Sequence, residues 1–398
     1  MKSKPLRVLI GCNWSFDWPY VPELAEWNLR QGNLVDVLDS RRGTISTISL
    51  EDLRSYQPSA VSSVPPESLL AKVRRRLRTL AKTATTLRRM ARYDVVNIHF
   101  LSLWACVVAR LVRARSGGTV LTVWGSDFYR STDRNRAIFR RVMGSFDVIN
   151  FGNPVTSEDF SRVFPMAAKR LRICSFGIGK LDLIDSIAGK ETPAQIRSRL
   201  DIPGDAIVVC CGYNGVRAQN HFRMIEAAAQ VSASGRARCL FVFPMSYGGT
   251  SEYRAEVKDR LALAGVPHRV IEGFHTDADV ARWRMAANVL VTIQETDQLS
   301  ATVQEHLYCG AVLVAGDWLP YGILDQWKAP MIRTTIESLP SAIEHAILRA
   351  GGGPPNPEVK EKVRAASGWS SAIERWEGIY REAMEARWTD RRSEQWRR

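Results

Sequence analysis

Two carboxylates, Asp297 and Glu305, lie eight positions apart around a predicted helix start. Asp297 and Ser300 are residue types that favour the N-cap position, so the backbone N–H groups of residues 299–302 would point away from the helix. Such a helix start binds phosphate oxygens. Eight residues span little more than two helical turns, which places both carboxylates on a broadly shared face. The pattern suits a nucleotide sugar, and an ordinary capped helix with two solvent-facing acids explains it equally well.

Strands and helices alternate through both halves of the chain, which predicts βαβ units and parallel sheets. Residues 288–293 are an apolar, β-branched run that predicts a buried strand just before the carboxylates. Strand, short loop and helix start is the order in which open α/β sheets place their ligands. Residues 41–66 are polar and predict a surface loop, and Gly117-Gly118 is expected to end a helix before a strand at 119–123. Further strands are predicted at 6–10, 34–38, 94–99, 147–151, 171–175, 206–211, 239–243 and 268–271.

The segment from Asp297 to Ala315 resembles the C-terminal signature of the group 1 (family 4) retaining glycosyltransferases. In that family two glutamates separated by seven residues precede an apolar helix ending in Cys-Gly or Ala-Gly and a valine-rich strand. Here Asp297 replaces the first glutamate, Glu305 matches the second, and Cys309-Gly310 ends the helix. The resemblance implies that Asp297 lies near the donor sugar and that Glu305 holds the nucleotide ribose. It also implies a donor site lined by Leu299, Ser300 and Ala301.

The same resemblance implies the α/β fold called GT-B, in which two Rossmann-like, doubly wound domains face a central cleft. A chain of 398 residues is long enough for two domains. We expect an N-terminal acceptor-binding domain over residues 1–182 and a nucleotide-sugar-binding domain over 192–350. Residues 358–398 are expected to form helices that cross back onto the N-terminal domain.

A second donor-binding element is expected at residues 212–221, where the family carries an arginine and a lysine that neutralise the diphosphate. Tyr213 stands at the arginine position, and the lysine position falls near Gln219. Arg217 is the nearest replacement cation, and His221 is a candidate hydrogen-bond donor. Asn214 and Gly215 complete this predicted donor-binding segment.

In the first half, His99 ends a predicted strand, as does a histidine that faces the donor sugar in the family. Asp127 follows Trp124-Gly-Ser, which resembles the family's His-Gly-Ser-Asp, so it is expected either to bind hydroxyls or to cap the following helix. Trp14 and Trp18 follow the first strand and are candidate acceptor contacts, because aromatic faces stack on sugars; packing in the interdomain cleft is the alternative. His99, Asp127 and Asp297 are therefore the predicted catalytic residues.

The net charge of +14 is unevenly distributed. Residues 68–92 predict a helix with an apolar stripe, nine basic residues and no acidic ones. Such a helix suits an anionic membrane surface or a lipid-pyrophosphate acceptor, whereas packing on the sheet with an arginine-rich outer face is the alternative. Without aromatic residues between the basic ones, nucleic acid is not an expected partner.

The remaining composition predicts a cytoplasmic protein that is peripheral on the inner face of a membrane. No apolar run approaches the length of a membrane span, and no secretory signal is recognisable at the N-terminus. The seven cysteines are an odd number without metal-ligand spacing, so reduced, packed thiols are expected. Because no Asp-x-Asp directly ends a predicted strand, neither a metal nor a cofactor is expected.

The sequence therefore predicts a glycosyltransferase that moves a sugar from a nucleoside diphosphate donor to a lipid-linked or surface polysaccharide acceptor with retention. The departing diphosphate would be stabilised electrostatically by helix N–H groups and Arg217. Two alternatives stay open: a catalytically silent GT-B subunit that binds glycan or nucleotide, and a GT-B sugar-nucleotide epimerase. A dinucleotide-dependent dehydrogenase is disfavoured, because no Gly-x-Gly-x-x-Gly follows the first strand.

Overall fold

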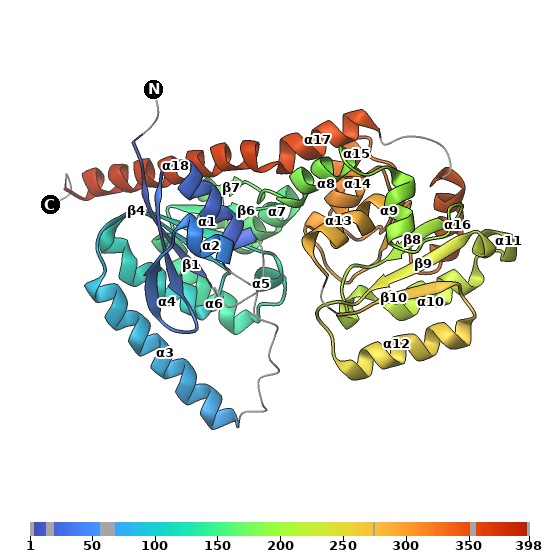
Figure 1. The fold of residues 1–398 in the computed structure, drawn as a ribbon. Coiled ribbons are helices and arrows are strands. Elements are labelled where there is room, and N and C mark those ends of the chain that lie inside the picture. The colour runs from blue at the N-terminus through green and yellow to red at the C-terminus, as the bar shows by residue number, and fades with distance from the viewer. Residues whose placement is uncertain (1–3, 13–19, 56–67, 274, 351–355, 396–398) are drawn as a thin grey trace. The chain divides into compact units, whose positions relative to one another are not determined.

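The computed structural model describes residues 4–12, 20–55, 68–273, 275–350 and 356–395. The chain forms two compact units (Figure 1). Unit 1 comprises Met1–Gly177 and Trp369–Arg398, and unit 2 comprises Ile178–Gly368. Sequence patterns predict a first boundary between residues 182 and 192 and a return at 358, whereas the structure divides the chain at Gly177 and Gly368.

Unit 1 is built on a sheet with the strand order β3-β2-β1-β4-β5-β6-β7. All pairs are parallel except β2 with β3. The short antiparallel β3 and helix α2 fall within residues 41–66, so the prediction of an irregular loop was wrong there. The strands are β1 (Arg7–Cys12), β2 (Leu34–Asp39), β3 (Thr44–Thr47), β4 (Tyr93–His99), β5 (Ser116–Val123), β6 (Val148–Phe151) and β7 (Leu171–Ile173).

Helices pack on both faces of this sheet, and separate apolar clusters fill the two sides. The predicted basic helix is confirmed as α3. The helices of unit 1 are α1 (Tyr20–Arg30), α2 (Leu50–Ser55), α3 (Leu69–Arg89), α4 (Leu103–Val112), α5 (Ser126–Tyr129), α6 (Asp133–Val142), α7 (Pro154–Val163) and α18 (Trp369–Gln395).

Helix α18 returns the end of the chain to unit 1, where it lies along the sheet (Figure 1). Its buried face carries Trp369, Trp376 and Tyr380. Gly118 permits the close approach, since a Cβ at this position would come within 2.6 Å of the Ala383 carbonyl carbon. The two glycines expected to end a helix lie inside β5 instead; the α18 backbone passes over Gly118, whereas a Cβ at Gly117 would meet the Asp94 carbonyl oxygen at 2.5 Å.

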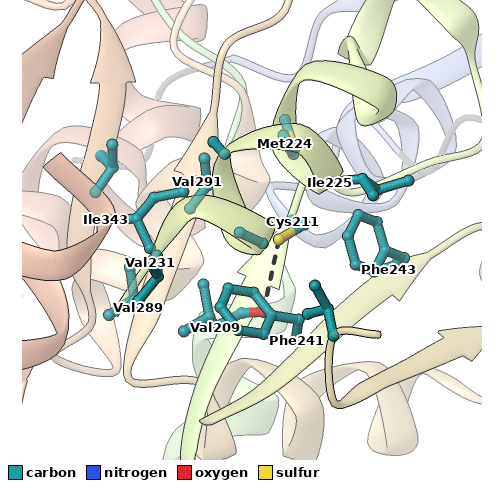
Figure 2. Packing of buried hydrophobic residues seen from close by; sticks show 14 of the residues in the cluster. Val209, Cys211, Met224, Ile225, Val231, Phe241, Phe243, Val289, Val291 and Ile343 are labelled. Atoms are coloured by element: carbon teal, nitrogen blue, oxygen red, sulfur yellow. Dashed lines mark hydrogen bonds between the residues drawn. The ribbon is translucent and has the colours of Figure 1, made fainter. Parts of the chain in front are cut away.

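Unit 2 contains a fully parallel sheet with the order β10-β9-β8-β11-β12-β13. Figure 2 shows how β8 and its neighbours pack against Met224 and Ile225 from the following helix. Cys211 faces this cluster while the adjacent Cys210 faces the cluster on the other side, as strand alternation requires. The strands are β8 (Ile207–Cys211), β9 (Cys239–Pro244), β10 (His268–Ile271), β11 (Val289–Thr292), β12 (Val312–Gly316) and β13 (Met331–Thr334).

The helices of unit 2 connect these strands and cover both faces of the sheet. They are α8 (Lys180–Ala188), α9 (Pro193–Arg199), α10 (His221–Gln230), α11 (Ala233–Ala237), α12 (Ser251–Ala264), α13 (Asp277–Ala286), α14 (Ala301–Tyr308), α15 (Gly322–Gln326), α16 (Leu339–Ala350) and α17 (Pro357–Ser367).

Each sheet has a point where the direction of chain progression reverses. In unit 1 this point lies between β1 and β4, and in unit 2 it lies between β8 and β11. Ligands of doubly wound α/β sheets bind beyond the carboxyl ends of the strands at such a point. The loops after β8 and β11 in unit 2 contain the predicted donor-binding residues, so sequence motif and topology agree on the location.

Candidate functional site

The loop after β8 turns sharply at Gly212, whose φ is +70°. A Cβ at this position would lie 2.9 Å from Gln219 Oε1 and 3.3 Å from His221 Nε2, so glycine leaves room for both side chains. Asn220 adopts the left-handed conformation, with φ 62°, and α10 then begins at His221. Gly212 is therefore required both by its positive φ and by the space that the side chains of Gln219 and His221 occupy.

His221 is fully buried at the start of α10. Its Nδ1 lies 3.1 Å from the Tyr253 hydroxyl, whereas Nε2 has no partner among the described residues. Burial lowers the pKa of His221 to about 4, so the imidazole is neutral near pH 7. The side chain therefore contributes no positive charge, and donor binding by His221 stays a prediction.

The loops after β8 and β11 are joined by a neutral hydrogen-bond network. The Tyr213 hydroxyl and the Gln219 amide both donate to Gln294 Oε1, at 3.0 and 2.7 Å. The Asn220 side chain also donates to the carbonyl of Ile293 at 2.7 Å. Tyr213 and Gln219, which occupy the positions of the family's cation pair, thus bind a second loop instead.

Asp297 occupies the approach to α14. Its Oδ2 accepts the backbone N–H of Ser300 at 3.0 Å and the hydroxyl of Tyr321. Desolvation raises the pKa of the Asp297 carboxyl, and these two donors oppose the rise. Leu299 has a φ of +64°, a conformation that costs a non-glycine residue energy and marks functional turns. Ser300 is the N-cap by position, but its side chain makes no capping bond to the first turn of α14.

Glu305 points into the protein and is only 4% exposed. Its Oε2 accepts a hydrogen bond from Arg284 Nε of α13 at 3.1 Å, and Arg284 Nη2 reaches the Thr302 hydroxyl at 3.3 Å. Sequence reasoning missed Arg284 because it lies outside the recognised segment, on another helix. The carboxylate predicted to hold a ribose is therefore already neutralised by a buried guanidinium.

Arg217, the expected replacement cation, is largely exposed and forms an ion pair with Glu256 at 3.1 Å. Its guanidinium lies 4.4 Å from the centre of the Tyr253 ring. The neighbouring Asn214 is buried and caps its own loop by accepting the N–H of Val216 at 3.0 Å. Gly215 approaches the loop after β9 closely, because a Cβ there would meet the Gly248 carbonyl at 2.8 Å.

His99 ends β4 in unit 1 and is buried among aromatic rings. The ring centres of Phe176, Trp124 and Trp376 lie 5.6, 6.1 and 6.2 Å from that of His99. Neither ring nitrogen of His99 has a partner among the described residues, and burial lowers its pKa to about 3. The next residue, Phe100, has a φ of +76°. The imidazole is therefore neutral, and it lies beside a strained turn; a ligand-facing role for His99 stays a prediction.

Asp127 is a buried carboxylate that fixes the backbone around His99 and Trp124. Its oxygens accept the N–H groups of Leu101 at 2.6 Å, Trp124 at 3.0 Å and Phe128 at 3.1 Å. Burial raises its pKa to about 6, and the backbone donors oppose the rise. Asp127 lies inside α5, whose N-cap is Gly125, so its carboxylate holds neighbouring backbone N–H groups instead of capping the helix from the N-cap position; hydroxyl binding by Asp127 stays a prediction.

The remaining sequence-based assignments concern aromatic residues, metals and membranes. Trp14 and Trp18 lie outside the described residues. Across the described ranges, no group of three or more His, Cys, Asp or Glu side chains could hold a metal ion. Within the same ranges no helix is both long and apolar enough to cross a bilayer. All seven cysteines are free thiols.

No family model and no curated protein sequence matches this chain. Solved structures do match its fold. Sucrose-phosphate synthase from Thermosynechococcus elongatus superposes with a TM-score of 0.71 at 15% identity, covering 96% of this chain and 100% of that one. An α,α-trehalose 6-phosphate synthase from Burkholderia multivorans gives 0.71 at 11% identity, covering 98% and 99%. HepE of Anabaena, in complex with UDP and glucose, gives 0.68 at 14% identity, covering 94% and 98%.

These similarities establish the fold class as GT-B, with two Rossmann-like α/β domains. The α/β fold expected from the sequence is thereby confirmed.

Proposed function

We propose that this chain is a glycosyltransferase that moves a sugar from a nucleoside diphosphate donor to a lipid-linked or surface polysaccharide acceptor, with retention at the anomeric carbon. The observation that carries the proposal is the site in unit 2. There the loops after β8 and β11 meet at the topological reversal of the sheet, and Asp297 lies at the start of α14. The UDP and glucose in the HepE structure are the kind of ligands that such a site suits.

In the proposed mechanism the N–H groups at the start of α14 receive the diphosphate, and Asp297 orients the donor sugar. Tyr321 and the Ser300 N–H fix the position of that carboxylate. His99 of unit 1 stays a predicted catalytic residue, and its imidazole is neutral. Catalysis would rest on stabilisation of the departing diphosphate by groups already in place, which needs no separate general base.

The first test is a thermal-shift panel with UDP, GDP, dTDP, CMP and NAD. A ligand at about 100 times its Kd stabilises the folded protein by about 2.7 kcal/mol. We expect one nucleoside diphosphate to raise the melting temperature, and Glu305→Gln to abolish that rise if Glu305 holds the ribose. Glu361→Ala, an exposed carboxylate on α17, is the matched control and should respond like the wild type. An unchanged ligand shift in Glu305→Gln would remove the ribose role.

The stereochemical outcome requires its own measurement. Once donor and acceptor are known, the product's anomeric proton coupling in NMR spectra distinguishes retention from inversion. An inverted product would contradict the assigned mechanism while leaving the transferase activity intact.

A catalytically silent partner subunit is the second candidate. It is favoured by one observation: neutral Tyr213 and Gln219 stand where the family carries cations, and both are engaged by Gln294. Absence of any shift in the ligand panel would support this candidate, and a glycan or protein ligand would then be the next target.

We also propose that α3 brings the protein to an anionic membrane surface on the cytoplasmic side. The first turns of the helix expose Leu70 and Leu77, at 73% and 61%. Their neighbours Arg74, Arg75, Arg76 and Arg78 are exposed as well. The second half of α3 packs on the rest of unit 1 through Leu87, which is buried. Exposed leucines between arginines match the requirements of an interfacial helix, in which apolar side chains enter the acyl boundary while cations meet lipid phosphates.

A further inference from the structure

Arg284 is a buried cation that the predicted site does not include. It lies on α13 and is 7% exposed. Two of its nitrogens are used by Glu305 and Thr302, both on α14. The third, Nη1, makes no hydrogen bond to a described residue, yet it keeps contact with solvent. An arginine that is otherwise enclosed thus presents one unused donor edge beside the start of α14.

The surroundings of Arg284 belong to the same sheet edge as the loops after β8 and β9. Desolvation raises the pKa of the Tyr247 phenol, and the charges of Arg284 and Lys180 oppose the rise, so both cations lie near that hydroxyl. The backbone of Tyr247 is also joined to the loop after β8, because its carbonyl accepts the N–H of Gly215 at 2.8 Å. The free edge of Arg284 is therefore near the residues that sequence and topology assign to the donor.

A nucleoside diphosphate leaving group develops negative charge that a transferase site must stabilise. The groups nearest the usual cation positions are neutral: Tyr213 and Gln219 are uncharged, and His221 is neutral because burial lowers its pKa to about 4. Arg217 and Arg284 are each paired with a glutamate, but the Arg217 side chain is 66% exposed and that of Arg284 only 9%. A guanidinium held in place by two bonds acts on a developing charge more strongly than an exposed, solvated one.

We propose that Arg284 is the cation that binds and stabilises the departing diphosphate, delivered from α13 rather than from the loop after β8. One edge of the guanidinium fixes Glu305, and the Nη1 edge donates to a phosphate oxygen beside the α14 N–H groups. This inference rests on the proposed transferase function, because it assigns a residue to that same site.

The experiment measures binding of inorganic pyrophosphate, of UDP, GDP and dTDP, and of the matching nucleosides by isothermal titration calorimetry. Removing Arg284 alone leaves Glu305 buried without its partner, so the informative variant is Arg284→Met combined with Glu305→Gln. Glu305→Gln by itself is the reference. We expect the double variant to bind inorganic pyrophosphate at least tenfold more weakly than Glu305→Gln, whereas nucleoside binding, which the ribose role assigns to Glu305, should not differ between these two variants. Arg284→Lys, which keeps the charge, should retain part of the affinity.

Arg217→Met is the competing variant, because Arg217 is the cation that sequence reasoning assigns to the phosphates. A larger loss of pyrophosphate affinity in Arg217→Met than in the Arg284 double variant would overturn the inference. Equal loss of nucleoside and diphosphate binding would overturn it too, since it would show that Arg284 only maintains the fold.

Different binding results would contradict the Arg284 assignment and the transferase proposal. If the wild type binds a nucleoside diphosphate and the Arg284 variants bind it equally well, the inference is wrong and the transferase proposal stands. If the wild type binds pyrophosphate through Arg284 but no nucleoside diphosphate, the anion site stands and the donor assignment is wrong. Binding of neither ligand by the wild type overturns the inference.

Discussion

Replacing Tyr321 by phenylalanine tests how the Asp297 carboxylate is held. Tyr321 is fully buried, and its hydroxyl donates to Asp297 Oδ2, which otherwise accepts only the Ser300 N–H among the contacts described above. A hydrogen bond to a charged group contributes about 1.5–3 kcal/mol, and leaving a buried carboxylate short of a donor adds to that loss. Unit 2, at residues 178–368, is of a size at which each kcal/mol shifts the melting temperature by about 2–4 °C. Tyr321→Phe should therefore melt roughly 3–12 °C lower than the wild type.

Tyr213→Phe is the matched control, because it removes the same hydroxyl from the same unit. Its acceptor is the neutral amide oxygen of Gln294 at 3.0 Å, so the expected loss is only about 1 kcal/mol. Thermal unfolding followed by tryptophan emission measures both variants. Equal losses in the two variants would refute the reasoning that the charge on Asp297 makes the difference.

The pH dependence of unfolding gives a second test of how the Asp297 carboxylate is held. The folded pKa of Asp297 is raised, so the folded state holds this proton more strongly than the unfolded state, and the contribution to stability falls as pH rises from about 4. Loss of the Tyr321 hydroxyl raises the pKa of Asp297 further, because the ionised carboxylate loses a hydrogen-bond donor that stabilises its charge. The difference between Tyr321→Phe and the wild type should therefore grow between acidic and neutral pH. A difference that is constant across this range would contradict the assignment.

Three further predictions concern other parts of the chain. Because burial raises the folded pKa of Asp127 to about 6, the wild type should lose about 2 kcal/mol between pH 4 and 6 relative to Asp127→Asn; parallel unfolding curves would contradict this. Gly212→Ala should weaken nucleotide binding and destabilise unit 2 by about 1–2 kcal/mol, since φ is +70° and the Cβ would meet Gln219; calorimetry measures both effects. Binding to phosphatidylglycerol vesicles should fall by roughly 1 kcal/mol per arginine in the serine variant of Arg74, Arg75, Arg76 and Arg78. Its control is the serine variant of Arg110, Arg134, Arg141 and Arg223, which lie outside α3; equal losses in both variants would refute a specific role for α3.

Much of the fold could be predicted from the sequence, because strand and helix periodicity are local properties. The predicted strands before His99 and before Gln294 are present as β4 and β11, and the basic helix is present as α3. Predictions failed where a distant element decides the local structure. Gly117-Gly118 is typical of a helix stop, but both glycines belong to β5, where Gly118 leaves space for α18 and Gly117 for the backbone of Asp94. The antiparallel β3 has no alternating pattern of its own and is defined by its pairing with β2.

The sequence by itself determined which segments would reach the carboxyl edges of the sheets, because motif spacing and strand order are written along the chain. It also identified Asp297 and Glu305 as candidate donor-site residues. Only the tertiary structure decided what those carboxylates contact. Arg284 and Tyr321 come from elements outside the recognised segment, and their contacts with Glu305 and Asp297 arise from packing. The charge and orientation of a buried group depend on its neighbours in space, and those neighbours come together only when the chain folds.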